Sequence, residues 1–294
     1  MGDIIIENKS FRLIAGEDCV AKSLVCKANG QECLAPDAKL PLFASIQERP
    51  FNNEVKLAYP CKHTTFAANS LRREGDRLIV GFDVAPYYAF IKITEKEEYV
   101  AFVLEGFEET EKGYGSLYLD RPPVTEFCLL QLAVADRAHF GERLNVSWDE
   151  DTAVNVLATA PQTLIDAEVR DGYHIMHAHV RKDVRLKGPG VALIACAKDS
   201  LMDSIAQVEE DYNLPHGVEN RRNPLNNASV YFTDNLCLEN VDQHIALAKA
   251  GGFRLMQIYY TCMFHEGDHW SFCGNYDYNE NYPNGREDLI AVLN

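Results

Sequence analysis

The sequence has no long uninterrupted apolar run and no surplus of basic residues. None of its apolar segments approaches the roughly 18 residues that a membrane-spanning helix needs, so no membrane partner is predicted. The formal net charge is −16, with 28 Lys and Arg against 44 Asp and Glu. Nucleic-acid binding requires clustered cations, so this balance argues against a DNA or RNA partner. It fits a soluble protein that binds neutral or cationic small ligands.

Two further features are missing, a secretory signal and paired cysteines. The opening MGDIIIENKSF lacks a basic region followed by an apolar core, so we expect no secretory signal. Nine cysteines is an odd number, and no two form a C-x-x-C motif. This usage favours reduced, mostly buried thiols. We therefore expect a cytoplasmic protein with no cofactor and no bound metal.

A sustained helical period is also absent from the first two-thirds of the chain. Short apolar or alternating runs recur there, separated by turn-like segments such as Ala28–Gly30 and Lys187–Gly190. Many strands with short turns predict a large antiparallel β-sandwich, which we assign to residues 1–197. The expected strands are Ile4–Ile6, Ser23–Cys26, Arg77–Val84, Ala89–Ile93, Tyr99–Leu104, Phe127–Val134, Val154–Ala158, Tyr173–Val180 and Val191–Cys196.

Residues 198–226 are predicted to form a helical connector and a linker. Ser200 is placed to cap a helix that runs to about Tyr212, with Asp203 in its first turn. The segment Leu214–Asn226 contains two prolines and a pair of arginines, which is typical of an inter-domain linker.

The pattern changes over residues 227–294, where strands alternate with helices. The runs Asn227–Asp234 and Phe253–Tyr260 predict buried strands, and Leu238–Ala250 and Gly285–Leu293 predict amphipathic helices. This alternation indicates parallel β-α-β units. Two strands cannot make a parallel sheet that is covered on both faces, so we interpret the segment as the first two units of a truncated (β/α)8 barrel. The fold class is therefore mainly β with a C-terminal α/β portion.

An unfinished barrel would leave a strand edge without a partner. The apolar side chains Leu255, Met256 and Ile258 would then be poorly covered. Such an edge is a template for pairing with another chain. We expect self-association through this region, or coverage of the edge by the sandwich.

The loop Thr261–Asn284 follows the second predicted barrel strand and is rich in polar and aromatic residues. Active sites of (β/α) barrels lie at the carboxyl ends of the strands. Sugar sites combine an aromatic plate with carboxylates and amides that bond to hydroxyl groups, so a carbohydrate ligand is predicted. Catalytic residues are not identified, because no pair of carboxylates flanking a scissile bond is recognisable. The candidate substrate-binding residues are Asp234, Tyr260, His265, Asp268, His269, Trp270, Asn275, Tyr276 and Asp277.

A zinc-dependent hydrolase is one alternative. The segment from His265 to His269 matches H-E-x-x-H, in which two histidines one helical turn apart bind zinc and the glutamate acts as base. Here the motif follows a strand, contains Gly267, and continues into Ser271–Asn275 without a helical pattern. The context therefore argues against metal binding in this loop.

His174, His177 and His179 raise the same question on a predicted strand. His177 and His179 would share one face of that strand, while His174 would point the other way. A pair of histidines without a nearby carboxylate is more often structural.

Another alternative is a non-catalytic carbohydrate-binding or scaffold module built on the sandwich. It is suggested by the tyrosines near predicted turns, which are Tyr87, Tyr88, Tyr114 and Tyr118.

The C-terminal segment combines the strand Ser229–Asp234, the helix Glu239–Ala250, Gly252 and the strand that ends at Tyr260. It continues through Gly274-Asn275-Tyr276 and Tyr282-Pro283-Asn284-Gly285 to Glu287-Asp288-Leu289. In this order, these elements resemble the opening of α-galactosidase-like glycoside hydrolases. In that clan a β-supersandwich precedes a (β/α)8 barrel, and the opening IENKSFRLIAGEDCVAKSLVCKANGQECL is similar to its first strands.

This resemblance implies the N-terminal portion of a glycoside hydrolase that acts on O-glycosidic bonds of an oligosaccharide or glycoside. In α-galactosidases the second barrel strand ends in two aspartates, whereas Tyr259 and Tyr260 stand there in this sequence. Asn275 and Tyr276 likewise replace an Asp-Trp pair. The carbohydrate class is therefore implied without galactose specificity. The clan's nucleophile and acid/base lie on later strands, which implies that these residues alone are inactive.

Overall fold

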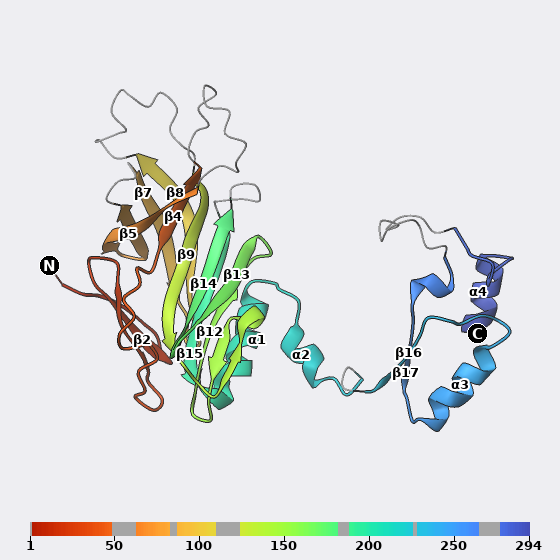
Figure 1. The fold of residues 1–294 in the computed structure, drawn as a ribbon. Helices are drawn as coiled ribbons and strands as arrows, with labels where there is room; N and C mark the ends of the chain where they lie inside the picture. The colour runs from red at the N-terminus through yellow and green to blue at the C-terminus, as the bar shows by residue number, and fades with distance from the viewer. Residues whose placement is uncertain are drawn as a thin grey trace, which may run out of the picture. The chain divides into compact units, whose positions relative to one another are not determined.

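The computed structural model describes residues 2–48, 63–82, 87–109, 124–181, 188–225, 228–264 and 277–294. The chain divides into two compact units, Met1–Val218 and Glu219–Asn294, which are described separately (Figure 1). The first unit is mainly β, as predicted, and its sheets are antiparallel. No helix in the described parts of the chain is long and apolar enough to cross a membrane.

The described strands of the first unit range from three residues in β10 to twelve in β5 and β9. They are β1 (Ile4–Glu7), β2 (Phe11–Ala15), β3 (Ala21–Cys26), β4 (Ala44–Glu48), β5 (His63–Glu74), β6 (Arg77–Phe82), β7 (Tyr87–Glu95), β8 (Val100–Glu109), β9 (Val124–Ala135), β10 (His139–Gly141), β11 (Val146–Trp148), β12 (Thr152–Ala158), β13 (Thr163–Arg170), β14 (Tyr173–Arg181) and β15 (Gly190–Ala197).

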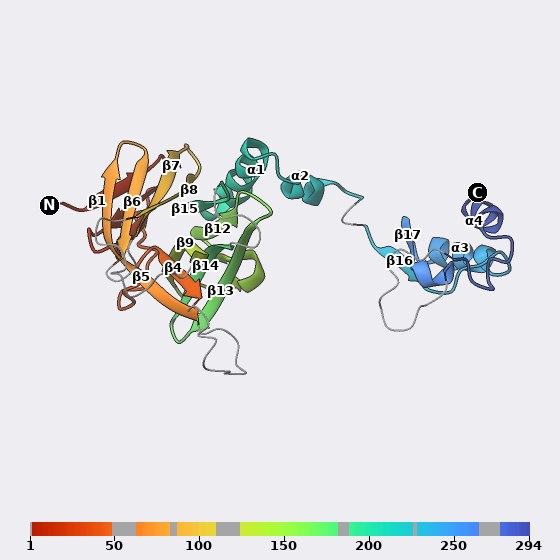
Figure 2. The ribbon, with the colours of Figure 1, turned by 90° about the horizontal axis from the view of Figure 1, so that it is seen from above.

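Strands β4 to β15 form one continuous sheet that folds over at β5. The strand order is β10-β11-β12-β15-β8-β7-β6-β5-β4-β9-β14-β13. The first half of β5 pairs with β4, with Ala67 opposite Ala44, and its second half pairs with β6, with Arg72 opposite Ile79. A register shift between Ala68 and Ser70 separates the two halves. The strands on either side of β5 therefore form two layers, which Figure 2 shows from above.

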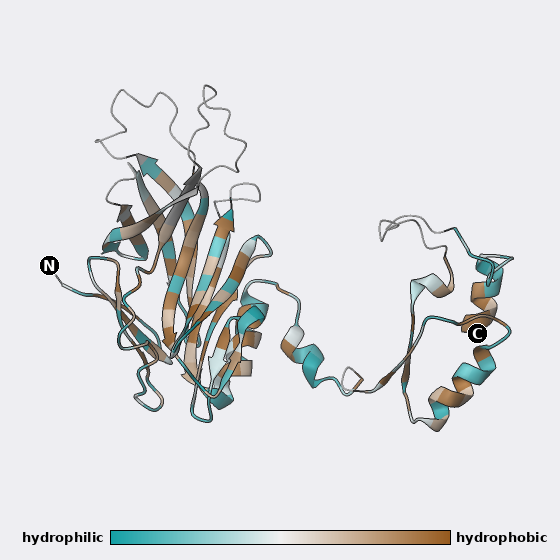
Figure 3. Ribbon diagram, viewed as in Figure 1, coloured by the Kyte–Doolittle hydropathy of each residue, from teal (hydrophilic) through white to brown (hydrophobic). Residues whose placement is uncertain are grey.

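Apolar side chains from the two layers meet in one core. Phe127 of β9 contacts Phe82 of β6 and Phe107 of β8, with ring centroids 6.3 and 5.5 Å apart. Alternate residues of β14 are buried, and bands of apolar and polar residues alternate along this strand (Figure 3). This arrangement is an antiparallel β-sandwich, as the alternating runs predict.

The outer face of β15 is covered by α1 (Leu201–Asp211). Residues Ala192, Ile194 and Cys196 pack with Val208 of α1, while their neighbours along β15 point into the sandwich core. Coverage on both faces explains why β15 is a continuous apolar run. Ser200 is the N-cap residue of α1, as predicted, although its side chain makes no capping hydrogen bond.

A smaller sheet, β1-β2-β3, adds its buried face to the same core. Arg73 of β5 contacts β1, the edge strand of this smaller sheet, because its Nη1 donates to the carbonyl of Ile5 at 2.8 Å. The same guanidinium makes two hydrogen bonds to the carboxylate of Glu95, each 3.1 Å long.

All nine expected strands coincide with strands of the structure, and the residues of the Arg77–Val84 run beyond Phe82 lie outside the described residues. The segment Leu214–Asn226, for which we expect an inter-domain linker, contains a short helix, α2 (Gly217–Arg222). The carboxylate of Glu209 accepts hydrogen bonds from the backbone N–H groups of Gly217 and Val218, at 3.1 and 3.2 Å, which starts this short helix.

In its described residues, the second unit contains strands β16 (Val230–Thr233) and β17 (Leu255–Ile258) and helices α3 (Val241–Ala250) and α4 (Arg286–Leu293). A short 3-10 helix, Tyr260–Cys262, follows β17. Strands β16 and β17 pair in parallel, as the β-α-β pattern predicts. Both helices lie on the same side of the strand pair (Figure 1), and their contacts with Met256 and Ile258 form the core of this unit.

The strands of the second unit are shorter than the predicted runs and are not buried on both faces. Val230 and Phe232 of β16 expose 40% and 53% of their surface, and Leu255 of β17 exposes 38%. The difference arises because α3 and α4 cover only one face of the pair, and no other described element of this unit covers the opposite face.

Replacing Phe127 by Ala should lower the free energy of unfolding of the first unit by about 3–5 kcal/mol, because the ring joins the two layers. Chemical denaturation monitored by circular dichroism measures this change. Leu164→Ala is the matched control, since Leu164 is 45% exposed on β13 and should cost far less. Equal losses in both variants would contradict the assignment of the core.

Candidate functional site

The carboxyl ends of β16 and β17 lie side by side in the second unit. Thr233 and Ile258 are opposite each other at the ends of the ladder. The carbonyl of Thr233 then accepts a hydrogen bond from the backbone N–H of Tyr259 at 2.9 Å, which extends the contact beyond β17. Asp234 and Tyr260 are the next residues of the two segments, so both predicted site residues follow adjacent strand ends.

The two flanks of the predicted binding loop are also held together. Phe264 and Tyr278 form an antiparallel bridge, and their ring centroids are 5.0 Å apart. Asn279 Nδ2 donates to the carbonyls of Thr261 and Cys262, at 2.9 and 3.2 Å. The residues on either side of the segment 265–276 are therefore held together beside the end of β17.

The predicted site residues fall into two groups. Asp234 and Asp277 are exposed and Tyr260 is half-buried, so their side chains are accessible at or near this edge. The remaining candidates lie outside the described residues. They are His265, Asp268, His269, Trp270, Asn275 and Tyr276.

The segment that leads from the loop into α4 is fixed by buried polar contacts. Tyr282 is 1% exposed, its hydroxyl donates to the carbonyl of Leu236 at 2.8 Å, and burial raises the pKa of Tyr282 to about 12. Asp288 accepts hydrogen bonds from the backbone N–H and the side-chain amide of Asn284, at 2.8 and 3.1 Å. Gly285 has a φ of 60°, which side chains rarely tolerate. These features account for Tyr282, Asn284 and Gly285 in the Tyr-Pro-Asn-Gly sequence.

Cys262 lies beneath the strand ends without the properties of a nucleophile. It is fully buried, and its thiol donates to the carbonyl of Thr233 at 3.6 Å. Burial raises the pKa of the Cys262 thiol, and the negative charge of Asp234 adds to this effect. The thiol therefore stays protonated near neutral pH and acts as a hydrogen-bond donor.

Sequence reasoning missed part of this edge, namely the face of the strands opposite the helices. Phe232 is paired with Gln257 in the parallel ladder, and both are exposed. The ring of Phe232 contacts that of Tyr259, with centroids 5.8 Å apart. The available signal was the period of two along each strand, which separates these residues from the helix-facing ones.

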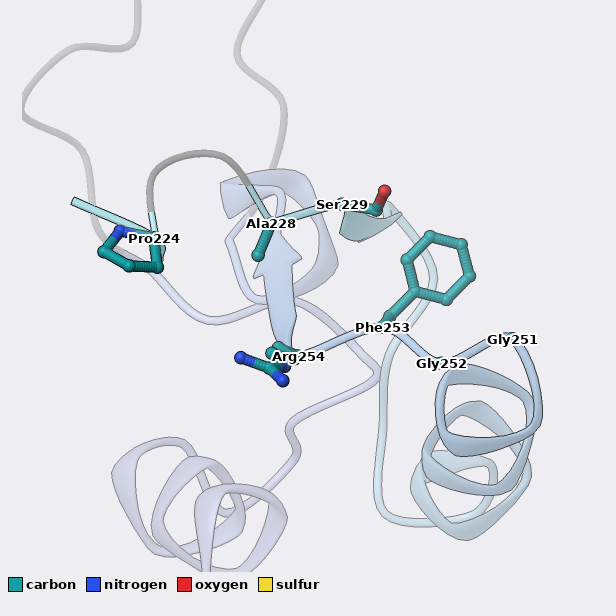
Figure 4. A pocket seen from close by; sticks show the side chains of 7 residues that line it. All are labelled: Pro224, Ala228, Ser229, Gly251, Gly252, Phe253 and Arg254. Atoms are coloured by element: carbon teal, nitrogen blue, oxygen red, sulfur yellow. The ribbon is translucent and has the colours of Figure 1, made fainter. Parts of the chain in front are cut away.

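A cavity of about 290 Å³ opens at the opposite, amino edge of the same two strands (Figure 4). Its polar side chains are those of Ser229 and Arg254, and the guanidinium of Arg254 points away from the ring of Phe253. Ligands of parallel sheets bind at the carboxyl edge. This cavity is therefore not the predicted site. Its other lining residues are Pro224, Ala228, Gly251 and Gly252.

The histidines of β14 are arranged as predicted. His174 is buried on the core side, and His177 and His179 share the other face, where His177 Nδ1 lies 2.5 Å from His179 Nε2. The premise that no carboxylate is nearby is wrong, because Glu126 Oε1 of β9 lies 2.7 Å from His179 Nδ1. The pairing of β14 with β9 creates this contact.

The surroundings of His177 and His179 disfavour the charged forms of their imidazole rings. Burial lowers the pKa of His177, and burial together with the neighbouring His177 lowers the pKa of His179 to about 4. Among the described residues, no group of three or more His, Cys, Asp or Glu is placed to hold a metal ion. Of the seven described cysteines, six are buried and all are free thiols.

Two of the four tyrosines behind the carbohydrate-module alternative are described, and they differ in exposure. Tyr87 is only 8% exposed, and its ring packs against Phe82 and Phe107 in the core. Tyr88 is exposed and lies beneath the guanidinium of Arg72. Tyr114 and Tyr118 lie outside the described residues.

No protein-family model and no curated protein matches this chain. Among solved structures, a GH31 family sulfoquinovosidase from E. rectale matches with a TM-score of 0.35 at 10% identity, over 87% of this chain and 41% of that chain. A bacterial glucoamylase complexed with acarbose matches with a TM-score of 0.40 at 8% identity, over 80% of this chain and 36% of that chain.

Alpha-N-acetylgalactosaminidase NagBb from Bifidobacterium bifidum has a more similar fold. It matches with a TM-score of 0.52 at 10% identity, over 99% of this chain and 56% of that chain. The chain therefore has a glycoside hydrolase-like fold and spans about half the length of this solved enzyme.

The half-buried His179 predicts a pH dependence of stability. Its pKa is lowered in the folded protein from 6.5 to about 4, so between these values the unfolded chain binds a proton that the folded chain does not. The free energy of unfolding should therefore fall as the pH falls through this window. Urea denaturation at a series of pH values measures the slope, which should be smaller in His179→Gln. An unchanged slope in this variant would show that His179 is not responsible.

Proposed function

We propose that this chain is the N-terminal portion of a glycoside hydrolase that acts on O-glycosidic bonds of an oligosaccharide or glycoside. The observation that carries the proposal is the fold likeness to a solved α-N-acetylgalactosaminidase, which extends over 99% of this chain. In this proposal residues 1–197 form the sandwich domain, residues 198–226 the connector, and residues 227–294 the first part of a (β/α)8 barrel.

The proposed saccharide site is the carboxyl edge of β16 and β17. Parallel pairing places Asp234 and Tyr260 on adjacent strand ends, and the bridge between Phe264 and Tyr278 brings both flanks of the loop to the same place. Exposed carboxylates and amides at such an edge can bond to sugar hydroxyls. We propose that the loop residues His265, Asp268, His269, Trp270, Asn275, Tyr276 and Asp277 complete the site.

Hydrolysis of a glycosidic bond needs two carboxyl groups, one on each side of the scissile bond. One protonates the leaving oxygen, and the other acts as nucleophile or activates water. The family that the sequence resembles carries these groups on barrel strands after the second. We therefore propose that the chain of 294 residues binds saccharide without hydrolysing it.

The purified chain should release no p-nitrophenol from a panel of p-nitrophenyl α- and β-glycosides, while binding methyl glycosides in ligand-observed NMR. Asp234→Asn should weaken that binding severalfold, because the exposed carboxylate would no longer accept charge-assisted hydrogen bonds. Asp171→Asn, at an exposed turn of the sandwich, is the matched control. Turnover that survives purification and disappears in Asp234→Asn would overturn the claim of inactivity.

We further propose that the chain self-associates through the amino half of the uncovered face. Val230 and Leu255 are opposite each other in the ladder and are 40% and 38% exposed. Parallel sheets are normally covered on both faces, so this apolar pair favours contact with a second copy.

Sedimentation velocity at increasing concentration should show a dimer that the double variant Val230→Lys, Leu255→Lys abolishes. Two added charges on a buried interface cost several kcal/mol, which is enough to prevent association. Leu247→Lys is the control, because Leu247 is 60% exposed on α3. A strict monomer at all concentrations would refute self-association.

A further inference from the structure

Phe232 is the most exposed aromatic residue in the described part of the chain, with 53% of its surface accessible. A phenylalanine has no polar group that would benefit from contact with water. Leaving a large part of this ring in water therefore costs free energy that burial against a ligand would recover.

The alternation of side chains places Phe232 on the face that the helices do not cover. Its neighbour Tyr231 points to α3, where its hydroxyl lies 2.8 Å from His244 Nδ1. Met256 and Ile258 likewise pack into the helix-facing core. The residues between them, including Gln257, therefore belong to the opposite face.

Phe232 is one end of a short row of aromatic rings. Its ring and that of Tyr259 have centroids 5.8 Å apart and planes inclined at 51°. Tyr259 in turn contacts Tyr260, with centroids 4.7 Å apart and the same inclination. The hydrogen bond from Tyr259 N–H to the Thr233 carbonyl fixes the backbone beneath the row. The first two rings thus form a tilted pair at the carboxyl end of the sheet.

Polar groups accompany the aromatic pair only at this end of the face. Gln257 is directly opposite Phe232 in the ladder and is exposed. Asp234 is exposed two residues beyond Phe232 in the same alternation. At the amino end, by contrast, the face carries the apolar pair Val230 and Leu255. The carboxyl half of the face therefore suits a polar ligand with an apolar side, and the amino half suits an apolar protein surface.

We propose that Phe232 and Tyr259 form a stacking wall for one pyranose ring, with Gln257 and Asp234 bonding to its hydroxyl groups. A pyranose has an apolar C–H face and a rim of hydroxyls, which match an aromatic ring bordered by an amide and a carboxylate. This inference rests on the proposed saccharide-binding function and names the residues that carry it. It requires none of the loop residues outside the described ranges.

Saturation-transfer NMR on the full chain tests the stacking geometry directly. The probes are methyl α-D-galactopyranoside, methyl α-D-glucopyranoside and N-acetyl-D-galactosamine. We expect the strongest saturation on the ring C–H protons of one sugar face. Phe232→Ala and Tyr259→Ala should each weaken binding about tenfold, while Tyr259→Phe, which keeps the ring, should retain it. Tyr88→Ala removes an exposed tyrosine of the sandwich and serves as the control.

Each outcome separates this inference from the function on which it rests. Binding that persists unchanged in Phe232→Ala and Tyr259→Ala would overturn the stacking wall and leave the saccharide function standing. No saturation of any probe by the unmodified chain would overturn both. Circular dichroism checks that the variants fold. If Phe232→Ala does not fold, Gln257→Leu is the deciding variant. Unchanged affinity of Gln257→Leu for the sugar probes would refute the role of this sheet face.

Discussion

Parallel pairing of β16 with β17 is the constraint from which the candidate site follows. Parallel strands need a crossover, and α3 supplies it on one face of the pair. The crossover sets both carboxyl ends at one edge, where the Tyr259–Thr233 hydrogen bond extends the ladder. The proposed saccharide site, from Asp234 to the anchored flanks of the loop, depends on this edge.

The sequence predicts elements best where hydrophobic pattern and burial coincide. β15 and β9 are apolar runs in the core and were recognised from their composition. The strands β2, β4, β5, β10, β11 and β13 were not recognised. β13 (TLIDAEVR) lies at a sheet edge with most residues exposed, and β10 and β11 have only three residues each, so their patterns are too weak or too short. Pairing with neighbours, rather than local composition, makes these segments strands.

The site was predicted only in part for a related reason. Asp234 and Tyr260 follow from strand order, which the sequence contains. Phe232 and Gln257 depend on which face the helices cover, and an apolar run does not reveal whether one face or both are buried. Glu126 approaches His179 only through the pairing of β9 with β14, two strands well separated in the chain. Contacts of this kind arise from tertiary structure, so no local sequence motif predicts them.

The sharing of β5 between both layers has a consequence for how the first unit assembles. Neither layer is a closed module, because β4 needs β5 on one side and the much later β9 on the other. Such a topology has high contact order, and loop closure must precede most of its stabilising contacts. We expect slow, cooperative folding, because strands near the N-terminus such as β4 can complete their pairing only after β9 has been added. No stable half-sandwich should form. During synthesis the exposed edge of β4 would then be the surface that a chaperone most needs to protect.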